Sequence, residues 1–153
     1  LAVRERDADR AAARESGDPA DVYDGVWMVV DVDEHAHLVR ALRDADRAGV
    51  SSAVSGPCFE VWLILHLDDR RAAFTTPKAV KDHWAKLSGP TRNLPQQFAQ
   101  GDGHVADAID RAAALLAAHD RERTPRHQRN PSTEVGLLLL AISEASGENV
   151  RDL

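Results

Sequence analysis

The chain has 153 residues, of which 43% are hydrophobic and 29% are charged, and its formal net charge is −6. This length and composition fit one soluble globular domain, spanning residues 1–153, with a core of its own. A single cysteine excludes an internal disulfide framework, no apolar run approaches the roughly 18–20 residues that cross a bilayer, and there is no signal-peptide core, so we expect a cytoplasmic protein.

The first half of the chain predicts a helix followed by a strand–helix–strand unit. Residues 1–15 are rich in alanine, arginine and acidic residues, which is typical of a surface helix. Residues 26–30 form a continuous apolar run that ends in Asp31, which favours a strand over residues 26–31 that is buried on both faces. Residues 36–48 carry their apolar residues on one helical face, and residues 50–55 predict a second strand. Such a unit implies parallel pairing with a right-handed crossover.

The second half predicts helices only. Residues 58–67 are apolar nearly all round, so this helix should be buried. Residues 77–87 are amphipathic, residues 88–103 form a loop-rich stretch, and residues 104–119 form an alanine-rich helix. A closing helix is expected over residues 130–146, because its Asn-Pro-Ser-Thr start is typical of an N-cap followed by proline in the first turn.

These elements predict an α/β fold with a small parallel sheet flanked by helices. Two strands make a poor sheet, because a parallel sheet needs both faces and its edges covered. We therefore expect a further strand beside residues 26–31, and a first residue that is leucine rather than methionine agrees with an N-terminally incomplete domain. An uncovered strand edge also predicts self-association into a homo-oligomer.

Two carboxylates, Asp31 and Asp33, stand at the end of the first predicted strand. Carboxylates at the end of a buried strand are costly unless they are solvated, hydrogen-bonded or bound to a cation, and active sites of parallel α/β sheets gather at that end. Magnesium takes carboxylate oxygens and keeps several waters. The pair is therefore a candidate metal site, and the alternative is a cap for the following helix.

Glu60 is a third candidate, because it is the only charged residue, histidine aside, in the apolar helix over residues 58–67. This helix follows the second strand, so its N-terminus should point to the same sheet edge as Asp31 and add a carboxylate to the same cleft. The alternative is a first-turn glutamate that is favoured by the helix dipole alone.

Histidine and cysteine provide weaker candidates. His66 is expected to be a buried histidine bonded to a backbone carbonyl. His35 and His37 are either exposed residues at a helix start or metal ligands, and no cysteine–histidine spacing indicates zinc. Cys58 stands at a helix N-terminus, which favours a thiolate, but no base is assigned to it.

One basic cluster breaks the acidic balance of the chain. Proteins that bind nucleic acids usually show a basic stripe, whereas here the basic residues gather only in Arg121, Arg123, Arg126, His127 and Arg129. The cluster is either a solvated loop or a loop that contacts phosphates and gives salt-sensitive binding.

Three segments together resemble the RloB-like proteins, a bacterial family encoded in restriction and phage-defence neighbourhoods. They are residues 26–34 (VWMVVDVDE), 55–68 (SGPCFEVWLILHLD) and 130–135 (NPSTEV). The family usually has Ser-Asn-Pro-Cys-Phe-Glu-Leu-Trp where this chain has Ser-Gly-Pro-Cys-Phe-Glu-Val-Trp. The resemblance covers residues 26–142.

The resemblance implies a Toprim fold, in which Asp31 and Asp33 would be the Asp-x-Asp metal ligands. Glu60 would be a further acidic residue near that site, and Lys86 is a candidate for a later family lysine. The remaining motif residues, to which the resemblance gives no role, are Asn130, Ser132 and Thr133.

The chain departs from the family at its start. A Toprim domain begins with a strand that carries a glutamate, and no such element precedes Val26. Catalysis should therefore be impaired unless that strand is supplied.

The preferred function is a nuclease-like domain of a bacterial phage-defence system. It would be an endonuclease of the Toprim type that uses magnesium or manganese to cut DNA or RNA phosphodiesters. The main alternative is a non-catalytic module that binds nucleic acid or a partner ATPase. A third reading is a phosphotransfer enzyme that uses the same carboxylates on a nucleotide.

Overall fold

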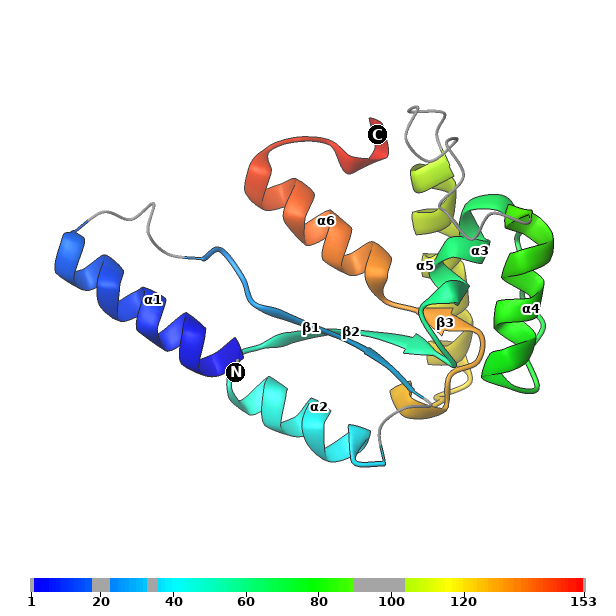
Figure 1. Cartoon of the computed structure of the whole chain (residues 1–153), viewed down its shortest axis with the longest axis horizontal. Helices are drawn as coiled ribbons and strands as arrows, with labels where there is room; N and C mark the ends of the chain where they lie inside the picture. The colour runs from blue at the N-terminus through cyan, green and yellow to red at the C-terminus, as the bar shows by residue number, and fades with distance from the viewer. Residues whose placement is uncertain (1, 18–22, 33–35, 90–103, 153) are drawn as a thin grey trace.

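The computed structural model describes residues 2–17, 23–32, 36–89 and 104–152, and within them it is a small α/β domain (Figure 1). The sheet lies between α6 on one side and α2 on the other, while α3, α4 and α5 gather at one end of it. The helices are α1 (Ala2–Ser16), α2 (Leu38–Arg47), α3 (Glu60–Leu67), α4 (Pro77–Ser88), α5 (His104–Arg121), α6 (Val135–Ser146) and the short 3-10 helices η3 (Arg126–Gln128) and η4 (Val150–Asp152). The strands are β1 (Trp27–Asp31), β2 (Ser51–Gly56) and β3 (Ser132–Thr133).

The sheet has the order β1-β2-β3, so β2 is its central strand. β1 runs parallel to β2, with Trp27 opposite Ser51 and Asp31 opposite Ser55. The predicted parallel strand–helix–strand unit is therefore confirmed. β3 pairs antiparallel with the end of β2, with Thr133 opposite Ser55, and the sequence did not predict this strand.

The prediction that the first strand is buried on both faces is wrong. Val29, in the middle of β1, is 48% exposed. Side chains alternate between the two faces of a strand, and Met28 and Val30 pack on the side of α2, against Leu38, Leu42 and Val54. Among the described residues β1 pairs only with β2, so no described strand lies along its second edge. The further strand expected there is not among these residues and stays a prediction.

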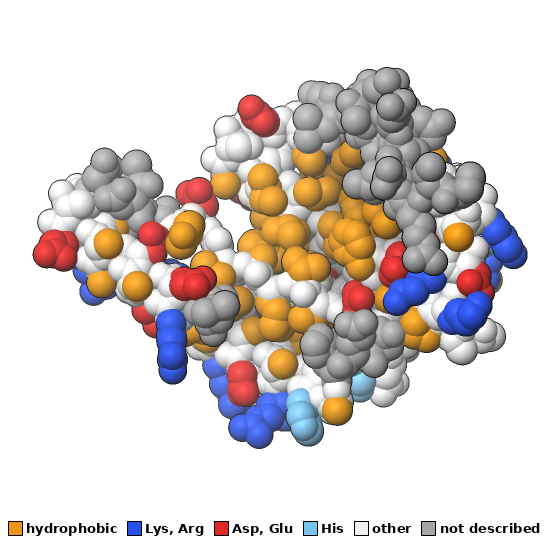
Figure 2. Space-filling view, viewed as in Figure 1, with side chains coloured by type: hydrophobic (Ala, Val, Ile, Leu, Met, Phe, Trp, Pro, Cys, Tyr) orange, Lys and Arg blue, Asp and Glu red, His pale blue; other side chains and the backbone are white. Residues whose placement is uncertain are grey.

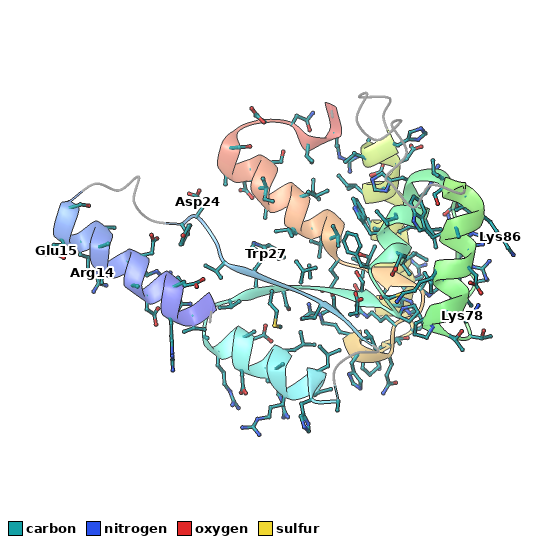
Figure 3. All side chains as sticks on the ribbon, in the orientation of Figure 1. Arg14, Glu15, Asp24, Trp27, Lys78 and Lys86 are labelled. Carbon is teal, nitrogen blue, oxygen red and sulfur yellow. The ribbon has the colours of Figure 1, made fainter. Side chains whose placement is uncertain are left out.

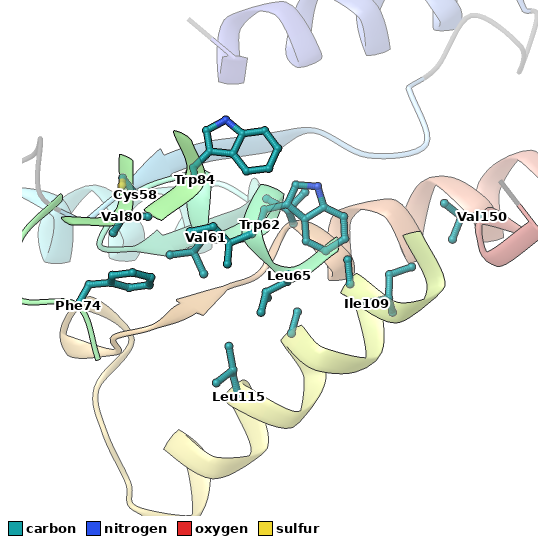
Figure 4. Close-up of a cluster of buried hydrophobic side chains, with 14 residues drawn as sticks. Cys58, Val61, Trp62, Leu65, Phe74, Val80, Trp84, Ile109, Leu115 and Val150 are labelled. Atoms are coloured by element: carbon teal, nitrogen blue, oxygen red, sulfur yellow. The ribbon is translucent and has the colours of Figure 1, made fainter. Parts of the chain in front are cut away.

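Most of the core surrounds α3, as the apolar sequence of this helix predicted (Figure 4). Val61, Ile64 and Leu65 are 1% exposed. The neighbouring helices α4 and α5 pack on α3 and contribute Val80 and Ile109 among others. The helix begins at Glu60, two residues later than predicted, and the burial of most of its residues explains why it needs no amphipathic pattern.

The predicted N-cap at Asn130 is also wrong, because α6 begins at Val135. The Asn130 side chain instead binds both backbone groups of Phe74: Nδ2 donates to the carbonyl at 2.7 Å, and Oδ1 accepts from the amide at 3.0 Å. The next residues form β3, and the buried hydroxyls of Thr133 and Ser55 are hydrogen-bonded at 2.9 Å. The motif therefore ties distant loops together.

The other predicted helices are present within a few residues of their expected bounds, as α1, α2, α4 and α5. The loop predicted over residues 88–103 lies outside the described residues from residue 90 onwards. No helix in the described part of the chain is long and apolar enough to span a membrane.

His66 is the buried histidine that the sequence predicted. Its ring is 5% exposed and Nδ1 donates to the Trp62 carbonyl at 2.9 Å. Burial lowers the pKa of His66, against the opposing effect of the Trp62 hydrogen bond. The folded protein therefore favours the neutral ring.

Truncation of the core should cost far more stability than truncation of the exposed strand face. We expect Ile64→Ala to lower the free energy of unfolding by about 2–5 kcal/mol, because it leaves a cavity inside the α3 core. Val29→Ala should cost less than about 1 kcal/mol, because Val29 is half exposed. Urea unfolding followed by circular dichroism measures both. Equal losses would contradict the packing described above.

Acidification should destabilise the protein through His66. The pKa of His66 in the folded protein lies below the ordinary histidine value of about 6.5, so below that pH the unfolded chain binds a proton that the folded chain resists. The free energy of unfolding should fall as pH drops from 6.5 through the folded pKa. His66→Asn should flatten this pH dependence when unfolding is measured at several pH values, and an unchanged slope would show that His66 is not the cause.

Candidate functional site

Asp31 ends β1 at the carboxyl end of the parallel strand pair. It lies opposite Ser55 in the sheet, and the next amide, that of Val32, donates to the Ser55 carbonyl at 2.9 Å. Strand alternation puts Asp31 on the face of Val29, away from α2. Ligand sites of open α/β sheets collect at this end of the strands, so Asp31 stands where chemistry is expected.

A cavity of about 540 Å³ opens beside Asp31 and brings the predicted carboxylates Asp31 and Glu60 together. Its other lining residues come from α3 and its preceding turn and from α4: Phe59, Leu63, Lys81, Asp82, Trp84 and Ala85. Asp31 and Glu60 are both half-buried. Three elements thus build one site with three carboxylates and one lysine. The third carboxylate, Asp82, is paired with Lys78 at 2.6 Å.

Glu60 faces this cavity because of how α3 starts. Cys58 and Val61 stand three positions apart, so they share a helical side, and both are buried in the core. That anchoring leaves Phe59 and Glu60 on the outer side, where Glu60 is the first residue of the helix. The buried thiol of Cys58 is 2% exposed, which argues against its use as a nucleophile.

The turn before α3 depends on Gly56. A Cβ at this position would lie 2.1 Å from the Arg129 carbonyl oxygen, a distance that no side chain tolerates. The asparagine usual in the resembling family could not stand here unless the backbone at Arg129 moved. Close packing of the loop before β3 against this turn therefore fixes where α3 and Glu60 begin.

Lys81 is the site residue that sequence reasoning missed. It lines the cavity from α4, whereas Lys86, the lysine chosen from the resemblance, does not. Figure 3 shows Lys86 on the outer side of α4, pointing away from the rest of the molecule. The spacing of Lys81 to Trp84 and Ala85 places the three on one helical side and was the available signal.

The cavity suits a hard cation in its donor chemistry, but the described residues supply only part of a metal site. Among them, no group of three histidine, cysteine, aspartate or glutamate side chains is close enough to hold a metal ion. Asp33 lies outside the described residues. Magnesium commonly uses one or two protein carboxylates and fills its other positions with water and substrate phosphate. Asp31 and Glu60 fit that arrangement.

The alternative to metal binding was that the carboxylates at the strand end cap the following helix, and the structure tests this for Asp31. The N-cap of α2 is His37, and it makes no side-chain capping hydrogen bond. Asp31 is therefore not the cap of this helix. His37 is exposed, and His35 lies outside the described residues.

The basic cluster divides into structural and exposed members. Arg126 donates from Nε to Glu134 Oε1 at 2.8 Å and from Nη2 to Glu134 Oε2, and Nη2 also binds Ser52. Glu134 is 6% exposed and also accepts from the Val54 amide at 3.0 Å. The Glu134 carboxylate raises the pKa of Arg126. This ion pair fixes η3 to β2.

The other arginines of the cluster also include one that is paired and two that are exposed. Arg129 pairs with Asp120 at 2.5 Å and is largely buried. Arg121 and Arg123 are exposed. The cluster is thus neither a purely solvated loop nor a uniform phosphate-contacting surface.

Comparison with protein-family models matches residues 4–142 to the RloB-like protein model. The chain belongs to the RloB-like protein family. The match extends the resemblance seen over residues 26–142 towards the N-terminus and includes α1. Neither the curated proteins nor the solved structures gave a match. The Toprim assignment stays an expectation.

Loss of Arg126 should unfold the protein far more readily than loss of an exposed arginine. Arg126→Ala leaves the buried Glu134 carboxylate without a countercharge, and we expect a loss of about 2–4 kcal/mol, below the value for a fully buried pair because Arg126 is one-third exposed. Arg121→Ala, the matched control, should change stability by less than about 0.5 kcal/mol.

A double variant separates charge from packing. In Arg126→Ala/Glu134→Gln the buried group is neutral, so part of the lost stability should return in thermal unfolding measurements. No recovery would show that the arginine acts through packing alone.

Proposed function

We propose that this RloB-like protein is a metal-dependent nuclease-like domain of a bacterial phage-defence system, acting on DNA or RNA phosphodiesters. The observation that carries the proposal is the shared cavity of Asp31 and Glu60 at the carboxyl end of β1. Membership of the RloB-like protein family also supports this proposal. A cytoplasmic location, where nucleic acid is accessible, belongs to this proposal.

The residues would divide the work as follows. Asp31, with Asp33 beside it in the sequence, would hold magnesium or manganese, and Glu60 would bind a second ion or accept a hydrogen bond from the attacking water. The bound metal would supply Lewis-acid activation of water and charge neutralisation at the leaving oxygen. Lys81 would donate to a non-bridging phosphate oxygen, which needs no metal.

A non-catalytic module that binds a partner protein, such as an ATPase, is the second candidate. An open groove of about 840 Å³ lies between the segment before β1 and the end of α6, and Tyr23, Trp27 and Ile142 line it. Leu137 and Leu140 of α6 are also exposed. Figure 2 shows hydrophobic side chains gathered across the middle of this face. Exposed apolar surface of this kind is typical of protein contacts, including contacts between copies.

Neutralising either carboxylate should remove metal binding. We expect Asp31→Asn and Glu60→Gln each to weaken magnesium and manganese binding by about tenfold or more in calorimetry, because each removes a charged oxygen ligand. Cleavage of labelled DNA and RNA, measured on the protein of the complete reading frame, should fall with it. Lys81→Ala should slow cleavage and leave metal affinity unchanged.

Asp69→Asn is the matched control, because Asp69 is exposed, pairs with Arg71 and lies outside the cavity. If wild type and both cavity variants bind the metal equally well, Asp31 and Glu60 are not its ligands. Metal binding with no cleavage of any nucleic acid would favour the binding module.

A further inference from the structure

We propose that a second cavity, between α2 and η3, is a phosphate-binding subsite that holds a backbone phosphate of the nucleic-acid substrate. This inference rests on the proposed function and adds to it how the substrate strand is held. The cavity has a volume of about 330 Å³, and Val32, His37, Arg40, Arg43 and His127 are among its lining residues.

The charge of this cavity is opposite to that of the chain. Two arginines and two histidines line it, and no described carboxylate does, although the whole chain carries −6. Arg40 is held only by a loose, exposed pair with Asp44 at 3.6 Å. Arg43 makes no ion pair or hydrogen bond with another described residue. Among the described residues, neither guanidinium group is therefore held in a buried ion pair.

The arginines and the helix that carries them point to phosphate. Arg40 and Arg43 are three residues apart, so they share one side of α2, and Arg40 lies in the first turn of that helix. The start of a helix carries free amides and a positive partial charge. Guanidinium groups bind phosphate oxygens with paired, charge-assisted hydrogen bonds. A phosphate here would meet cations and a favourable helix end together.

The opposite wall of the cavity is rigidly placed. His127 belongs to η3, whose neighbouring residue Arg126 is bound to Glu134 and Ser52. The buried ion pair thus holds η3 against β2, on which α2 also packs. A preorganised wall lowers the entropy lost when a ligand is bound.

The cavity also lies next to the carboxylate site. Val32 lines it, and Val32 follows directly on Asp31, which lines the first cavity. The two cavities thus flank the same strand end. Because a nucleic-acid strand carries a phosphate at every nucleotide, a strand with its scissile phosphate near Asp31 and Glu60 can place a neighbouring phosphate between Arg43 and His127.

Binding of a labelled single-stranded oligonucleotide, DNA or RNA, tests the subsite by fluorescence anisotropy in EDTA, where no metal-dependent cleavage occurs. Arg43→Ala should weaken binding by about fivefold to tenfold and lower the salt dependence by about one phosphate contact. Arg43→Lys should keep that salt dependence. Arg47→Ala is the matched control, because Arg47 is on the same helix and outside the cavity. Equal affinities and salt slopes for Arg43→Ala and Arg47→Ala would overturn the proposal.

Two further measurements distinguish this proposal from a failure of the proposed function and from a site for free phosphate. Asp31→Asn should abolish cleavage while oligonucleotide binding in EDTA persists, so loss of the proposed function and loss of the subsite are distinguishable. Inorganic phosphate, titrated alone, tests a free-anion site: if Arg43→Ala loses phosphate binding but keeps full oligonucleotide affinity, the nucleic-acid assignment is wrong. Thermal unfolding confirms that each variant is folded.

Discussion

The carboxyl end of β2 is the fixed point of this structure. Three contacts hold it: the Ser55 hydroxyl binds Thr133, the Val54 amide binds the Glu134 carboxylate, and Gly56 lets the Arg129 carbonyl approach within contact. From this end the chain turns directly into α3, which sets the place of Glu60. The same Glu134 holds η3 through Arg126. One anchored strand end therefore positions both the cavity beside Asp31 (the carboxylate cavity) and the His127 wall of the cavity between α2 and η3 (the basic cavity).

A buried carboxylate at this place costs free energy, and an apolar pair of equal size could well be more stable. The contribution of Glu134 is to fix how the loop docks on the strand. Its two oxygens bind a backbone amide of β2 and a guanidinium group of η3, so the loop can dock in only one register. Fully satisfied polar networks of this kind rigidify their surroundings. Such rigidity is what a site needs when its groups come from separate elements.

The helices and the parallel unit could be predicted from periodicity, because each is long enough to show its apolar face or its apolar run. β3 could not, since a strand of two residues carries no pattern. The apolar run of β1 did not tell a central strand from an edge strand, and the cap pattern at Asn130 lost to two hydrogen bonds with Phe74. Parallel topology predicted that Asp31 and Glu60 share an edge. The spacing of Lys81 to Trp84 and Ala85 shows only that the three share a helical side, and whether that side faces the cavity depends on how α4 packs.

The acidic balance of the chain does not conflict with a nucleic-acid substrate. Exposed charges act over about a Debye length, roughly 8–10 Å at physiological salt, so a local group of arginines can attract a phosphate on a protein of negative net charge. The carboxylate cavity alone would repel that phosphate. A metal bound there would reverse the sign of the site, and the basic cavity would hold the strand whether or not the metal is present. Chemistry and positioning would then be separate duties, carried by Asp31 and Glu60 on one flank of the strand end and by Arg43 on the other.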